Sequence, residues 1–210
     1  MNLQTETKRN YTPEEYLEAE VQSDERHAYI DGEIVLMPGG LPNHNTITGN
    51  LHTELNVALK RNPYRVFVTD QRLWIPKKRI YTYPDIMVIA DPLQLQPGRR
   101  DTVMNPCFIA EVLSKSTRSY DKDEKFTAYR TIPEFQEYLL IDQYSIHIEH
   151  YIKSEERRWI LVDYEDENAE ISLSSIPCRV LVSDLYNKVD FSEPEDEQSD
   201  ALGTRERDCT

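Results

Sequence analysis

Cysteine and glycine are scarce in this chain of 210 residues, which has 3 cysteines and 6 glycines. The cysteines, Cys107, Cys178 and Cys209, are odd in number and widely spaced. They therefore form neither a disulfide framework nor a CxxC metal motif. This usage is typical of a reducing, intracellular compartment.

Long apolar runs are also absent. No segment approaches the roughly 18 consecutive apolar residues of a membrane-spanning helix. The first ten residues, MNLQTETKRN, lack the apolar stretch of a signal peptide. We therefore expect a cytoplasmic protein that does not interact with a membrane.

Positive charge is in short supply, with 24 Lys and Arg against 38 Asp and Glu and a formal net charge of -14. This acidity argues against a non-specific basic coat for nucleic acid, but it leaves room for a local cationic groove. The length suits one domain with a full core. We predict a domain over residues 11–191, a flexible N-terminus over 1–10 and an acidic, disordered tail over 192–210.

Local patterns in the first half predict two helices and a hairpin. Thr12 and Glu15 form a capping box, which predicts a short helix in YTPEEYLEAE. Alternating apolar residues flank Asp31-Gly32, a strong signal for a β-hairpin. Apolar residues at helical spacing predict a helix of about four turns over 43–59.

The rest of the chain is mostly strand-like. Apolar runs of strand length with β-branched residues predict strands in RVFVTD, QRLWIPK, YPDIMVIA, CFIAEVL, EYLLID, SIHIEHYI, RRWILVDY, ISL and RVLV. One further segment, DKDEKFTAYR, is typical of a helix. Together with the front helices, these strands indicate an α/β protein.

Two carboxylates interrupt consecutive apolar strands. Asp85 opens one run and Glu111 lies in the middle of the next. A carboxylate inside a buried strand costs several kcal/mol unless a cation or hydrogen bonds compensate for it. Strand geometry lets both side chains point from neighbouring strands to one end of the sheet. A divalent metal between them is the simplest shared partner, and it could activate water against a phosphate.

A lysine completes this candidate site. Asp121, Lys125 and Tyr129 follow one another at four-residue steps on one side of the predicted helix. Lys125 could orient the attacking water or stabilise charge on the phosphate, and Glu33 could add a third carboxylate. In the alternative interpretation, Lys125 and Asp121 are only a helix-stabilising pair worth about 0.2 to 0.5 kcal/mol. Asp85 would then end a turn, and Glu33 would be solvated.

Four further residues are candidates for substrate binding. His44 lies at the start of the long helix, where helix N-termini attract anions. Lys77, Lys78 and Arg79 lead towards Asp85 and could contact phosphates, although three adjacent cations usually form a solvated loop.

His147 and Glu149 fall on the same face of a later strand. Two ligands do not make a metal site, so we interpret this pair as part of a polar sheet face.

An ordered set of motifs carries a family resemblance: Asp31-Gly32-Glu33, Pro84-Asp85, EVLSKST over 111–117, Asp121, Lys125-Phe126 with Tyr129, and PEFQEYLLID over 133–142. From about Tyr11 to Phe191, the chain resembles the Uma-two family of restriction-endonuclease-like proteins, within the PD-(D/E)xK nuclease superfamily. The resemblance implies a mixed central β-sheet flanked by α-helices, Mg²⁺-dependent phosphodiester hydrolysis, and metal ligands at Asp85 and Glu111.

One position departs from the superfamily pattern. The usual lysine lies two residues after the glutamate, where this chain has Leu113. The family pattern moves the lysine into the next helix, which matches Lys125. Glu33 matches an early acidic position of the family.

We therefore expect an endonuclease that cleaves DNA with Mg²⁺ or Mn²⁺ and acts as a homodimer, because each chain offers one site to a two-stranded substrate. A non-catalytic binding or regulatory module on the same scaffold is the main alternative, since the chain is acidic and lacks a long basic stripe or an aromatic platform. Metal-free carbohydrate hydrolysis by the carboxylate pair ranks last.

Overall fold

The computed structural model describes residues 10–37, 39–115, 117–155 and 157–192. The predicted flexible N-terminus and acidic tail therefore lie outside the described residues, apart from Asn10 and Ser192. In chain order the elements are α1 (Pro13–Gln22), β1 (His27–Ile30), β2 (Glu33–Leu36), α2 (Pro42–Leu59), β3 (Tyr64–Val68), β4 (Arg72–Ile75), β5 (Ile80–Thr82), β6 (Ile86–Ala90), β7 (Thr102–Val103), β8 (Phe108–Leu113), the π-helix η1 (Tyr120–Lys125), α3 (Phe126–Tyr129), β9 (Glu137–Asp142), β10 (Ile148–Glu155), β11 (Arg158–Tyr164), β12 (Glu170–Leu173), β13 (Cys178–Leu181) and α4 (Val182–Leu185).

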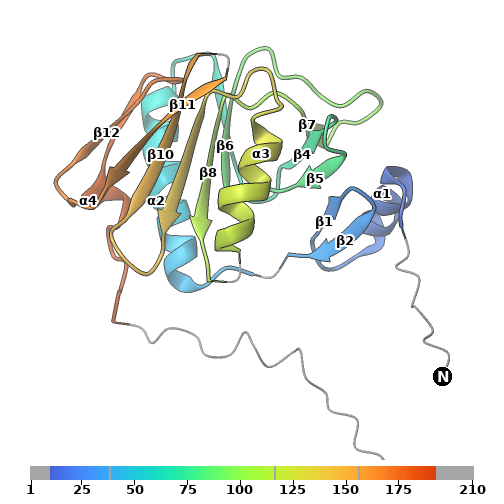
Figure 1. Cartoon of the computed structure of the whole chain (residues 1–210), viewed down its shortest axis with the longest axis horizontal. Helices are drawn as coiled ribbons and strands as arrows, with labels where there is room; N and C mark the ends of the chain where they lie inside the picture. Colours follow the sequence, from blue (N-terminus) through green and yellow to red (C-terminus); the bar gives the residue numbers. More distant parts are fainter. Residues whose placement is uncertain (1–9, 38, 116, 156, 193–210) are drawn as a thin grey trace, which may run out of the picture.

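A mixed sheet of six strands forms the centre, in the order β11-β10-β9-β8-β6-β3. Strands β8 and β9 run parallel, and the other neighbours are antiparallel. Helix α2 packs on one face, and η1 with α3 covers the other (Figure 1). The predicted α/β fold, a mixed central β-sheet flanked by α-helices, is confirmed. None of the helices in the described ranges combines the length and apolar character that crossing a bilayer requires.

A second mixed sheet, β2-β1-β5-β4-β7, lies beside the first and was not predicted. Strand β5 accounts for the difference, because residues 80–82 pair with both β1 and β4. Three buried tyrosines, Tyr16, Tyr29 and Tyr81, join α1 to this sheet with ring centroids 5.3 to 6.0 Å apart. Such aromatic packing fixes α1 against β1 and β5 of the second sheet.

Strand alternation decides which side chains meet each helical layer. In β8, Phe108, Ala110 and Val112 belong to the core under α2, whereas Ile109 and Leu113 belong to the core under α3. Glu111 lies between Ile109 and Leu113 in this alternation and therefore faces η1 and α3. Asp85 precedes β6 and stands two residues before Met87, which faces the same core. Glu111 is thus directed to the η1 and α3 face, and Asp85 lies beside it at the start of β6.

The helix predicted for DKDEKFTAYR forms, but its first part is a π-helix. Residues 120–125 make η1, which continues directly into α3. π-helical turns are rare and are enriched at functional sites. In η1 they bring Lys125 within 2.7 Å of the Asp121 carboxylate, so the predicted pair between these residues is present.

Glu137 is a buried carboxylate with a structural role. It begins β9, is fully buried, and accepts a hydrogen bond of 2.7 Å from His150. The backbone N–H groups of Ser174 and Ser175, between β12 and β13, also donate to it at 2.8 and 2.9 Å. Burial raises the pKa of Glu137, but these donors outweigh burial and the pKa is lowered overall.

We predict that Glu137→Gln lowers the free energy of unfolding by about 2 to 4 kcal/mol, because the buried His150 and two backbone N–H groups lose a charged acceptor. The pKa of Glu137 is about 4.5 when unfolded and lower when folded, so its contribution is present above that pH and is lost on acidification through the folded value. Urea unfolding at neutral pH and near pH 3 measures both effects. The difference in the free energy of unfolding between the parent and the variant should be smaller near pH 3. A difference that does not change with pH would contradict a stabilising role of ionised Glu137.

Candidate metal centre

A cavity of about 940 Å³ opens where β6 begins and β8 ends. Its floor includes Asp85 and Glu111, and Lys125 reaches it from η1. The start of α2 forms one wall, and the β1-β2 hairpin forms another through side chains such as Val35 and Leu36. The cavity therefore joins the predicted acidic residues and lysine in one solvent-accessible space.

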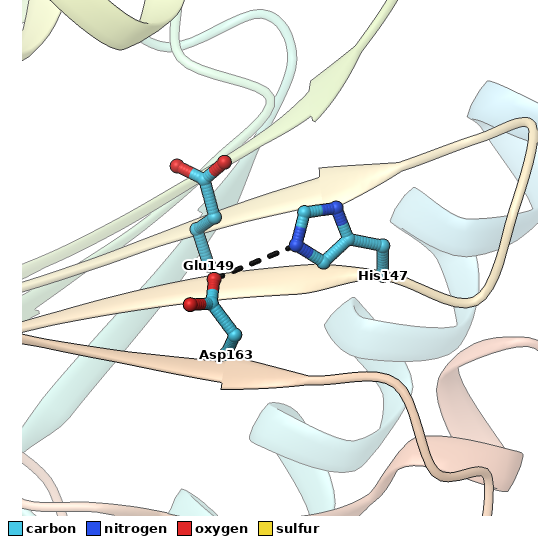
Figure 2. A group of neighbouring side chains, drawn as sticks. All are labelled: His147, Glu149 and Asp163. Carbon is cyan, nitrogen blue, oxygen red and sulfur yellow. Dashed lines mark ion pairs between the residues drawn. The ribbon is translucent and has the colours of Figure 1, made fainter.

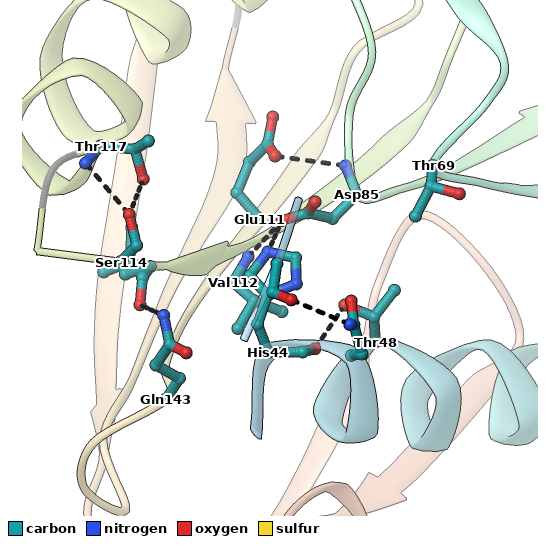
Figure 3. A network of polar contacts seen from close by, with 12 residues as sticks. His44, Thr48, Thr69, Asp85, Glu111, Val112, Ser114, Thr117 and Gln143 are labelled. Atoms are coloured by element: carbon teal, nitrogen blue, oxygen red, sulfur yellow. Dashed lines mark hydrogen bonds and ion pairs between the residues drawn. The ribbon is translucent and has the colours of Figure 1, made fainter. Parts of the chain in front are cut away.

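The two carboxylates are adjacent. The backbone N–H of Asp85 donates to Oε2 of Glu111 at 3.2 Å, and the backbone N–H of Val112 donates to Oδ2 of Asp85 at 2.8 Å (Figure 3). The Glu111 side chain is 2% exposed and the Asp85 side chain 19%. The structure thus brings together the two acids that the sequence analysis selected.

Lys125 and Tyr129 approach Glu111 from the covering helices. The ammonium of Lys125 lies 3.1 Å from Oε1 of Glu111, and the Tyr129 hydroxyl donates to the same oxygen at 2.6 Å. Burial lowers the pKa of Lys125, but Glu111, Asp121 and Asp85 raise it further, so the lysine carries its charge inside the site. Lys125 and Tyr129, which the sequence places on one side of the helix, therefore both contact Glu111.

His44 lies on the other side of Asp85. Its Nε2 is 3.1 Å from Oδ2 of Asp85, and its backbone carbonyl accepts from the Thr48 hydroxyl at 2.8 Å. The sequence analysis proposed His44 for substrate binding, which stays a prediction. What it missed was the contact with Asp85, because nothing local links residues 41 positions apart in the chain.

The acids have different proton affinities in the absence of a cation. Burial raises the pKa of Glu111 to about 8; Lys125 opposes this shift, and the Asp85 and Asp121 carboxylates add to it. Burial also raises the pKa of Asp85, but the hydrogen bond and charge of His44 lower it overall. A divalent cation would remove the repulsion between the acids and favour ionisation of both.

The donor set fits a hard divalent cation. Three carboxylates, those of Asp85, Glu111 and Asp121, act on the ammonium of Lys125, and Arg26 and Lys115 line other parts of the cavity. His44 is an imidazole and only partly compensates for this excess of negative charge. Carboxylate oxygens are the preferred ligands of Mg²⁺ and Mn²⁺. Asp85 and Glu111 would hold such an ion.

The other predicted site residues lie elsewhere. Glu33 begins β2 opposite Ile30 and is half-buried. Lys77, Lys78 and Arg79 lie in the turn between β4 and β5, and Arg79 is 3.5 Å from Asp31 of the hairpin turn. Within the described chain, none of these four residues lines the cavity. Their roles in the site stay predictions.

The chain is similar to one protein family and to two proteins of a cyanobacterium. A family model named Uma2 and described as "Putative restriction endonuclease" matches residues 13–181. The uncharacterized protein sll1609 of Synechocystis is 46% identical over 163 residues, covering 78% of this chain and 92% of that protein. A second uncharacterized Synechocystis protein, slr1290, is 34% identical over 182 residues, covering 86% of this chain and 93% of that protein.

A crystal structure also shares the fold. It is described as a "putative nuclease" from Anabaena variabilis, and it superposes with a TM-score of 0.66 at 18% identity. The match covers 84% of this chain and 97% of that one.

Proposed function

Because the chain belongs to the Uma2 family of restriction-endonuclease-like proteins, we propose that it is an endonuclease that hydrolyses DNA phosphodiester bonds with Mg²⁺ or Mn²⁺. The observation that carries this proposal is the contact between Asp85 and Glu111, with Lys125 only 3.1 Å from Glu111. Two neighbouring carboxylates with little access to solvent favour a bound cation, and their cavity is open to a substrate.

Each residue has a distinct part in the proposed reaction. When bound, a divalent cation supplies a water of lowered pKa and neutralises charge on the phosphate. Lys125, held by Glu111 and Asp121, donates towards the attacking water or the developing phosphate charge. Tyr129 fixes the orientation of Glu111 and His44 that of Asp85, because hydrogen bonds to ligands orient them.

We predict that the protein binds Mn²⁺ near neutral pH and that Asp85→Asn weakens binding by about tenfold or more, since the loss of an outer-shell partner alone costs about that much. Titration calorimetry measures the affinity. Asp91→Asn is the matched control, because Asp91 lies at the far end of β6 and pairs with Arg65 at 2.9 Å on the surface. Plasmid nicking should require the metal and stop in EDTA. Absence of Mn²⁺ binding in the parent would contradict the proposal.

The second candidate function is a non-catalytic binding or regulatory module. It is favoured by the net charge of -14 and by Leu113, 2% exposed, at the usual lysine position of the superfamily. If this second candidate function is correct, the protein binds DNA but does not cleave it when Mg²⁺ or Mn²⁺ is added.

We also propose a two-fold homodimer, which would let two copies of the site cut both strands of a duplex. Sedimentation of the full chain with and without DNA tests the assembly.

A further inference from the structure

Three potential metal ligands lie close together at the edge of the central sheet, outside the Asp85 and Glu111 site, with His147 facing Asp163 (Figure 2). Glu149 of β10 pairs directly with Asp163 of β11, so the two side chains stand on the same face. His147 lies two residues before Glu149 and shares that face, and its Nε2 is 3.5 Å from Oδ1 of Asp163. One ligand atom from each of the three residues lies within 4.8 Å of the others.

We propose that His147, Glu149 and Asp163 form a binding site for a transition-metal ion of the Zn²⁺ class. Ligand atoms about 2.1 Å from one metal are at most roughly 4 Å apart, so small rotations of the side chains would complete the set. One imidazole and two carboxylates suit Zn²⁺, Co²⁺ or Ni²⁺ better than Mg²⁺. The side chains of His147 and Asp163 are 31% and 54% exposed, which gives the ion an entry path and leaves positions for water.

The Glu149 carboxylate already has a donor on each of its oxygens. Its carboxylate pairs with Lys122 of η1 and accepts from the Tyr151 hydroxyl at 2.8 Å. Burial raises the pKa of Glu149, but Lys122 and Tyr151 lower it overall, so the group is ionised at neutral pH. The Lys122 side chain is 30% exposed and can move into solvent. Its ammonium therefore competes with the metal for Glu149.

This second site is distinct from the first but belongs to the same row of the sheet. Glu111 pairs with Leu140, and Leu140 pairs with Glu149. Glu111 and Glu149 are thus two strands apart, about 10 Å, with side chains on one face. The inference does not depend on nuclease activity.

Zn²⁺ titration of the full-length protein tests the proposal. The parent should bind Zn²⁺ at a site that Asp85→Asn leaves intact. His147→Gln and Asp163→Asn should each weaken that site more than about tenfold, because each removes a direct ligand. Lys122→Met should tighten it, since the competing ammonium is gone. Asp166→Asn, in the neighbouring turn after β11, is the matched control and should bind as the parent does.

Thermal unfolding gives a second measurement. Zn²⁺ should raise Tm in the parent and in Asp85→Asn, and it should raise Tm less in His147→Gln, because ligands stabilise the state that binds them. Unchanged Zn²⁺ affinity in both His147→Gln and Asp163→Asn would overturn the proposal. So would a parent whose Zn²⁺ binding disappears entirely in Asp85→Asn.

Discussion

Glu111→Gln should abolish metal-dependent DNA cleavage, with kcat falling by about 1000-fold or more. A loss of that size equals roughly 4 kcal/mol of transition-state stabilisation, which is reasonable for a displaced or weakened metal. Glutamine keeps the shape of the side chain, and its amide oxygen can still accept the hydrogen bond from the Tyr129 hydroxyl. It cannot supply the negative charge that the cation needs.

The same substitution should leave the metal-free protein as stable as the parent, or more stable. Glu111 is 2% exposed and lies near the carboxylates of Asp85 and Asp121, and its pKa of about 8 reflects this unfavourable position. A neutral amide removes that repulsion, while Lys125 keeps Asp121 at 2.7 Å. Thermal unfolding in EDTA, beside plasmid cleavage with Mg²⁺, measures the two effects separately.

Glu137→Gln provides the matched control, because it is the same change in a buried glutamate on the adjacent strand β9. We expect the opposite result there: reduced stability, and cleavage retained below the melting transition. Full activity in Glu111→Gln would show that another site cleaves the DNA, and a large loss of stability would show that Glu111 is a structural residue like Glu137.

Lys125→Met should lower kcat by about 100- to 1000-fold while Mn²⁺ still binds. Removal of a preorganised donor to the developing charge has an effect of this size. Mn²⁺ affinity should hold or rise, since the carboxylates lose a competing cation. The metal-free variant should be less stable by about 3 to 5 kcal/mol, because buried carboxylates lose their partner. Cleavage assays and Mn²⁺ calorimetry are therefore compared at a temperature where the variant is folded.

Arg118→Gln controls for the loss of a cation from the same segment. Arg118 precedes η1 and pairs with Asp142, a buried carboxylate of β9 outside the cavity. This variant should keep its kcat. If Lys125→Met lost Mn²⁺ binding together with kcat, Lys125 would be a structural support for the ligands and not a participant in the reaction.

Features encoded by short sequence patterns were predicted correctly. The Thr12 capping box begins α1, and the hairpin turns at Asp31 and Gly32 as expected. Asp85 and Glu111 could be selected because the cost of burying a carboxylate is visible in a single strand. Their adjacency then follows from the pairing of β6 with β8 in the central sheet.

Features that depend on distant segments could not be predicted. Strand β5 has only three residues, and it is a strand because β1 and β4 flank it. The contact of His44 with Asp85 requires the packing of α2 on the sheet. Asp163 joins His147 and Glu149 only through the register of β11, so their strand alone suggested an incomplete pair. The sequence pattern of η1 did not distinguish a π-helix from an α-helix.

The π-helical geometry of η1 determines which lysine forms an ion pair with which carboxylate. Along an ordinary α-helix each residue advances the side-chain direction by about 100°. Shortening this segment by one residue to restore such a helix would swing every side chain before α3 by roughly that angle. Lys122 and Lys125 now face Glu149 and Glu111, two strands apart. The length of one helical segment, as much as the identity of its residues, is therefore part of the specification of both sites.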